Sequence, residues 1–142
     1  MGLQAAMRAA AVTLMSDYAS DADIRLQVYP GRPKSINPPT GFVDAIRETL
    51  DHTTGLTKRI PTADIVIVHA IFDSKEAADQ KDAFMDGFID WTETRFHAAG
   101  ANTMLAVADT EDLPNYIPEW MEPARQLVYY ATRITLEGYA LG

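Results

Sequence analysis

Hydrophobic side chains recur every three or four residues in two parts of the chain, and this spacing predicts two helices. The first covers residues 3–19, and its apolar face consists of Leu3, Met7, Ala10, Leu14 and Tyr18. The second covers residues 73–96, because residues 73–76 are typical of a helix start. Its apolar stripe consists of Phe84, Met85, Phe88, Ile89, Trp91 and Phe96. The acidic side chains Asp79, Asp82, Asp86, Asp90 and Glu93 are expected on its solvent-facing side.

Alternating or continuous apolar residues predict strands at residues 24–29, 64–72, 103–110 and 127–139. Residues 42–50 are ambiguous, because their apolar residues follow helical spacing although a strand is also possible. We adopt the strand, which the family resemblance described below favours. Residues 51–57, with Gly55, are expected to form a turn, and residues 111–126 a loop.

These elements predict an α+β fold in a single domain, residues 1–142. A mixed or antiparallel sheet is expected to carry the second helix on one face, beside the N-terminal helix. At about 1.5 Å per residue, that second helix would be roughly 33 Å long, enough to cross the sheet.

Two further segments point to contacts between molecules. Residues 30–39 contain four prolines, which should make this segment a stiff, exposed arm. The final strand, residues 127–139, would be about 43 Å long, which exceeds the width of roughly 37 Å expected for a compact domain of this size. A strand of this length either bends sharply or projects beyond the core. A projecting strand needs a partner for its open edge, and a neighbouring subunit is the simplest one.

Composition narrows the possible functions. The formal net charge of −8 argues against a protein that reads nucleic acid through a basic face, although an acidic wall is compatible with DNA passing nearby. The absence of cysteine excludes disulfides, a thiol nucleophile and cysteine-ligated metals. No apolar run approaches the length of a membrane span, and residues 1–15 do not resemble a signal peptide.

Candidate chemistry is sparse, and we predict no catalytic, cofactor-binding or metal-binding residue. The sequence contains no phosphate-binding or nucleophile motif, and its three histidines lack metal-site spacing. His69, within an apolar strand, is interpreted as a hydrogen-bonded core or interface residue. The cluster of Asp109, Glu111 and Asp112 is interpreted as part of a solvated loop. An enzyme or small-molecule binding domain that uses these carboxylates with His69 is kept as an alternative.

Several stretches resemble the tail terminator (tail completion) proteins of long-tailed bacteriophages. The stretches are residues 28–33 (VYPGRP), 38–39 (PP) with 42–44 (FVD), 59–62 (RIPT) before the strand at 65–69, 72–74 (FDS) with 82–84 (DAF), 97–103 (HAAGANT) and 129–138 (YYATRITLEG). Their order and spacing carry the resemblance, because the family has no catalytic signature.

The resemblance implies a structural virion protein of the tail neck. Its copies would form a ring, typically a hexamer, that caps the tail tube, stops tube polymerisation and joins the head. Expected partners are further copies of the chain, the major tail tube protein and a head-completion or connector protein, with DNA passing through the ring without sequence-specific binding. The predicted interface residues are Tyr29, Pro30, Gly31, Arg32, Pro33, Tyr116, Trp120, Tyr129 and Arg133. A head-closure or connector-adaptor neck protein is the nearest alternative.

Overall fold

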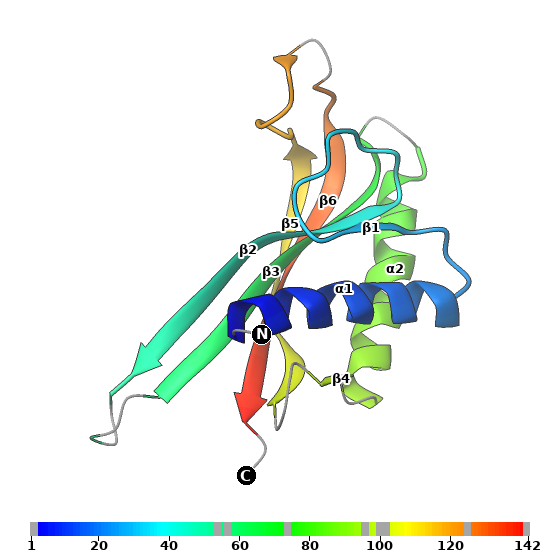
Figure 1. The fold of residues 1–142 in the computed structure, drawn as a ribbon. Coiled ribbons are helices and arrows are strands. Elements are labelled where there is room, and N and C mark those ends of the chain that lie inside the picture. Colours follow the sequence, from blue (N-terminus) through cyan, green and yellow to red (C-terminus); the bar gives the residue numbers. More distant parts are fainter. Residues whose placement is uncertain are drawn as a thin grey trace.

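A computed structural model of the chain describes residues 3–52, 55, 58–72, 75–94, 97–98, 103–123 and 126–140. In chain order its elements are α1 (Leu3–Asp21), β1 (Gln27–Tyr29), β2 (Thr40–Asp51), β3 (Lys58–Ile71), α2 (Ala77–Thr94), β4 (His97–Ala98), β5 (Thr103–Tyr116) and β6 (Tyr129–Ala140). They form one sheet in the order β1-β2-β3-β6-β5-β4, in which only the β1–β2 pair is parallel. The predicted α+β fold with a mixed sheet is therefore confirmed (Figure 1).

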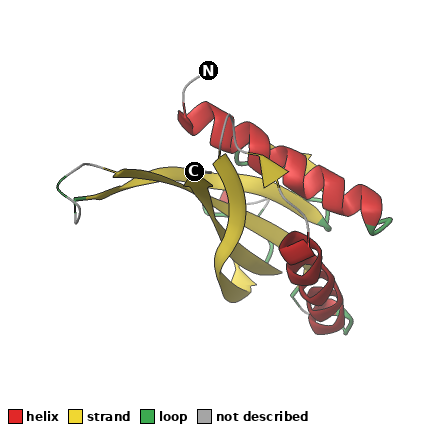
Figure 2. Ribbon diagram, turned by 90° about the horizontal axis from the view of Figure 1, so that it is seen from below, coloured by secondary structure: helices red, strands yellow, loops and turns green. Residues whose placement is uncertain are grey.

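Both helices pack on the same face of the sheet (Figure 2). Met7 and Leu14 of α1 and Phe84 and Phe88 of α2, which belong to the predicted apolar faces, are buried there. The Leu3 side chain and Phe96 lie outside the described part of the chain. Tyr18 joins the two helices, because its hydroxyl donates to the Phe84 carbonyl oxygen at 3.1 Å and its ring meets Phe88 edge-on at 5.2 Å. The acidic residues of α2 are exposed, as the pattern predicts.

The opposite face, which we call the helix-free face, carries a second apolar cluster of Ile36, Phe42, Val66, Val68, Met121, Tyr129 and Ala131. The middle of the segment at residues 30–39 lies over this cluster, so the prediction of a free, exposed arm is wrong. Pro33 and Ile36 are buried, and the Trp120 indole N–H donates to the Pro33 carbonyl oxygen at 2.8 Å. The arm packs within its own chain because it supplies apolar cover that neither helix provides on this face.

Several strand boundaries differ from the sequence-based expectations. β1 is shorter than predicted, β3 begins earlier, at Lys58, and β5 continues to Tyr116 through the first part of the predicted loop, residues 111–116. The register shift between Leu113 and Tyr116 accommodates Pro114 and keeps β5 paired with β6. Residues 42–50 are strand, as adopted, and a bulge between Val43 and Ala45 explains why their apolar spacing deviates from simple alternation.

α2 has 18 residues and is shorter than predicted. The predicted start at residues 73–74 and end at residues 95–96 lie outside the described residues.

The final strand, β6, is central, so the prediction of a projecting, unpaired strand is wrong. It pairs with β3 on one side and with β5 on the other, and both neighbours have 14 residues. A long strand is therefore fully paired because its neighbours are equally long. The part of the sheet that extends away from both helices is instead the β2–β3 hairpin (Figures 1 and 2).

Candidate functional site

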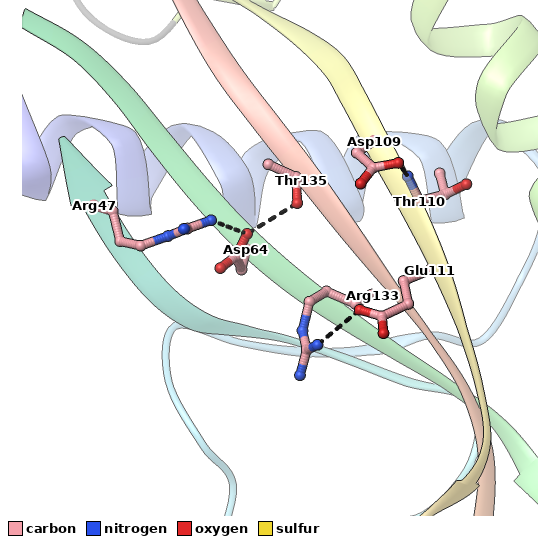
Figure 3. Close-up of polar contacts among 7 residues, drawn as sticks. All are labelled: Arg47, Asp64, Asp109, Thr110, Glu111, Arg133 and Thr135. Atoms are coloured by element: carbon pink, nitrogen blue, oxygen red, sulfur yellow. Dashed lines mark hydrogen bonds and ion pairs between the residues drawn. The ribbon is translucent and has the colours of Figure 1, made fainter. Parts of the chain in front are cut away.

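A row of polar side chains crosses the helix-free face beyond the second apolar cluster (Figure 3). It contains Arg47 of β2, Asp64 of β3, Arg133 and Thr135 of β6, and Asp109 and Glu111 of β5. Strand alternation places them together, because Asp64 continues the series of Val66 and Val68, and Arg133 and Thr135 continue that of Ala131.

Asp64 is the centre of this row and is only 9% exposed. Its Oδ1 accepts a hydrogen bond from Arg47 Nη2 at 2.9 Å and another from the Thr135 hydroxyl at 3.0 Å. A buried carboxylate is costly unless such partners are present, so Arg47 and Thr135 stabilise it. The arrangement links three strands through one side chain.

The other charged groups of the row also have partners close by. Arg133 Nη1 lies 3.0 Å from Glu111 Oε2, and Asp109 Oδ1 accepts the Thr110 backbone N–H at 2.8 Å. The carboxylates of the row thus contact arginine, hydroxyl and backbone N–H donors. The row is suited to polar surface contacts.

An aromatic hollow of about 540 Å³ adjoins the row. Arg32 and Trp120 line it together with Tyr116, Asp44 and Arg133. Arg32 Nε donates to Asp44 Oδ1 at 2.9 Å, and the guanidinium lies 5.1 Å from the centre of the Trp120 ring. Burial, with a smaller contribution from Asp44, raises the pKa of Tyr116, so its hydroxyl is neutral at physiological pH.

The structure brings only part of the predicted interface set together. Arg32, Tyr116, Trp120 and Arg133 line the hollow, whereas Pro33 is buried beneath Trp120. Tyr129 is 3% exposed, so its side chain belongs to the second apolar cluster and offers no contact surface.

The other predicted interface residues lie apart from the hollow. The Pro30 carbonyl oxygen accepts a hydrogen bond from the Arg8 guanidinium of α1, and Gly31 lies near the same group. Tyr29, in β1, donates its hydroxyl to the Gln27 side chain at 3.0 Å.

Sequence reasoning missed Arg47, Asp44, Asp64 and Thr135. Asp64 carried a usable signal, because it is a charged residue at the start of a continuous apolar run. Its partners could not be named in advance, since each comes from a different strand and the pairing registers were unknown.

His69 lies on the opposite, helix-bearing side and is 4% exposed. Its Nε2 is 2.9 Å from the Thr132 hydroxyl oxygen, and its ring meets Phe84 at 5.4 Å. Burial lowers the pKa of His69 to about 4, so the imidazole is neutral at pH 7. The interpretation of His69 as a hydrogen-bonded core histidine is confirmed.

The residues of the alternative enzyme site do not converge. Asp109 and Glu111 lie on the helix-free face, whereas His69 lies among the helices. Asp112 forms an ion pair with Lys81 of α2 at 3.2 Å. His69 instead lines an apolar groove of about 560 Å³ with Pro38, Ile71 and Phe84.

No protein-family model matches the sequence, and no curated protein is similar to it at a significant level. Within the described ranges, no group of three or more histidine, aspartate and glutamate side chains could hold a metal ion. No helix in the described part of the chain is long and apolar enough to cross a membrane.

Proposed function

We propose that this chain is a structural subunit of a long-tailed bacteriophage and that it acts as a tail terminator. Copies close into a ring, for which the resembling family suggests six subunits, at the end of the tail tube. The ring stops tube polymerisation and forms part of the surface to which the head is joined. In this role the protein belongs to the neck of the virion and is found in the host cytoplasm during assembly.

The projecting β2–β3 hairpin is the observation that carries this proposal. It extends beyond the layer covered by α1 and α2, and Leu50 near its end is 55% exposed (Figures 1 and 2). A bidentate contact between Arg59 and Glu48, at 2.7 and 2.6 Å, holds the two strands together there. An ordered element that has an exposed leucine and no core of its own is well suited to contact another molecule.

The charges of the helix-free face are compatible with DNA that passes through the proposed ring without tight binding. In the described part of this face, Arg32, Arg47 and Arg133 each lie within 3.0 Å of a carboxylate oxygen of the same chain. Arginines that are already paired neutralise fewer phosphates, and the chain as a whole carries a net charge of −8. A ring that presents this face to DNA would hold it only weakly.

The test is to mix the purified protein with polymerising tail-tube protein of the same phage and to view the tubes by negative-stain electron microscopy. The proposal predicts tubes with capped ends that no longer elongate when more tube protein is added. Normal elongation, with rings bound to the head connector instead, would identify a head-side neck protein. Binding to neither partner would contradict a role in the neck.

A further inference from the structure

Two long strand edges on opposite sides of the sheet lack a neighbouring strand in the described part of the chain. The outer side of β2 pairs with β1 only at Thr40–Phe42, which leaves residues 43–51 open. The outer side of β5 pairs with β4 only at Met104 and Leu105, which leaves residues 106–116 open. Open edges of this length favour pairing with another chain.

We propose that these edges join neighbouring copies, with residues 45–51 of one subunit pairing antiparallel with residues 107–113 of the next. The inference rests on the proposed ring and names the surfaces that close it. Along the sheet, three successive antiparallel pairs separate β2 from β5, so the two strands run in opposite directions. A copy rotated about a ring axis therefore presents its β2 antiparallel to the β5 of its neighbour.

Charge and strand alternation select the register of this contact. Arg47 and Glu111 both lie on the helix-free face, and their side chains are 58% and 60% exposed. Placing Arg47 opposite the neighbour's Glu111 also places Thr49 opposite Asp109. Opposite charges on directly facing residues stabilise a strand pair. Arg47 can keep its bond to Asp64, because a guanidinium has five N–H donors.

The same register gives the exposed Leu50 a complementary site. Leu50 falls next to Ala108 of the neighbour, beside a hollow of about 390 Å³ between α2 and β5. Ile89, Thr92 and Val107 line this hollow and offer apolar surface to a leucine side chain. One register therefore accounts for an exposed apolar side chain and for an unfilled space on the opposite edge.

Ring closure also fits this register. Within one chain Arg47 pairs with Thr62, Thr62 with Glu137, and Glu137 with Ala106, so Arg47 lies level with Ala106. Ala106 pairs with Glu137 and Glu111 with Arg133, and the register shift between Val107 and Asp109 adds no length. Opposite Glu111 of the neighbour, Arg47 is therefore displaced by four residues (137 − 133 = 4), or roughly 13 Å.

Four strands per subunit span about 19 Å across the sheet. The displacement therefore tilts the strands by about 35°, at the lower end of the 35–45° that is typical of closed barrels. The helices add bulk to one face and lie outside such a ring, where the circumference is larger. The helix-free face then lines the opening.

Disulfide trapping tests the contact directly, because the chain has no cysteine. The full-length double variant Thr49→Cys/Asp109→Cys should form intermolecular disulfides on oxidation, giving a ladder that ends at a closed ring. Within one subunit three strand spacings, about 14 Å, separate the two strands, which is too far for an internal bond. The control Thr49→Cys/Asp79→Cys places the second thiol on α2 and should stay monomeric on a non-reducing gel.

A charge exchange in the trapping variant tests the register. Arg47→Glu and Glu111→Arg should each reduce cross-linking by roughly tenfold, and the double exchange should restore it. The double exchange does not repair the contacts with Asp64 and Arg133 in the same chain, so recovery can come only from the contact between subunits.

Two outcomes separate this inference from the proposed function. Rings seen by sedimentation velocity without cross-links above the control level would overturn the edge pairing and leave tail termination standing. Monomers that cap tubes would have the same consequence. Cross-linked rings that fail to cap tubes would support the edge pairing and overturn tail termination.

Discussion

At the scale of single residues, β3 contains two buried polar side chains that are stabilised in different ways. Asp64 receives hydrogen bonds from Arg47 and Thr135 on the helix-free face. His69, five residues later, lies on the other face, in series with Ile65 and Ile67, and it contacts Thr132. Because successive side chains of a strand point to opposite faces, an odd spacing explains why these two polar residues serve different faces.

His69 should make the stability of the protein sensitive to acid. Burial lowers its pKa from 6.5 to about 4, so between these values the unfolded chain binds a proton that the folded chain does not. The stabilisation is complete above pH 6.5 and is lost as the pH falls towards 4, to a total of about 3 kcal/mol. In urea titrations at pH 7 and 4.5, His69→Gln should lose about 2–3 kcal/mol less than the parent on acidification. An equal loss in both proteins would contradict this assignment.

Gly87 in α2 should not tolerate alanine, although alanine normally favours a helix by about 1 kcal/mol. A Cβ at this position would lie 2.5 Å from the Tyr18 hydroxyl oxygen, which is held by Phe84. We expect Gly87→Ala to lower the free energy of unfolding by about 1–2 kcal/mol. Tyr18→Phe removes the obstructing oxygen, so the double variant should be more stable than the sum of the single changes predicts. Stabilisation by Gly87→Ala alone would show that Tyr18 moves freely.

At the scale of elements, the arm at residues 30–39 covers part of the helix-free face, where no helix packs. Its prolines make it stiff, as the sequence indicates, but Ile36 and Trp120 draw it onto Phe42 and Val66. Deleting the arm would therefore damage the fold as well as any contact with a neighbour. A deletion cannot serve as a test of assembly here.

Ile36→Ala should reveal this packing. Ile36 is 8% exposed, and its truncation should lower the free energy of unfolding by about 2–3 kcal/mol. The matched control is Ser35→Ala, at an exposed neighbouring position, which should change stability by less than about 0.5 kcal/mol. Equal unfolding curves for the two variants would mean that the arm is not held against the sheet in solution.

At the scale of the whole molecule, the subunit is asymmetric. One face of the sheet is covered by helices, the other carries paired charges, and one hairpin extends past both layers (Figure 2). In the proposed ring, such a subunit would meet its two neighbours through different patches, as heterologous contacts require.

Leu50→Asp should separate assembly from folding. The side chain is 55% exposed, so its loss should change the melting temperature of the monomer by no more than a few degrees. It should prevent ring formation and tube capping, because a carboxylate would face the apolar surface of Ile89 and Val107. Ile117→Asp is the matched control, since Ile117 is 43% exposed but lies outside the hairpin. Capping by Leu50→Asp at the parental level would remove the hairpin from the mechanism.

The sequence by itself determined the two helices, their apolar faces, the α+β class and the buried role of His69. These features depend on residue type and on the spacing of residues within one segment, so the segment alone is enough to predict them. Tertiary structure alone decided that β6 is central, that the arm is packed and that Asp64 gathers partners from neighbouring strands. Each of these depends on which strands are neighbours and in which register, and a bulge of one residue changes the face on which a side chain lies. The charged row and the open edges exist only once the strand order is set, so no local pattern could have predicted them.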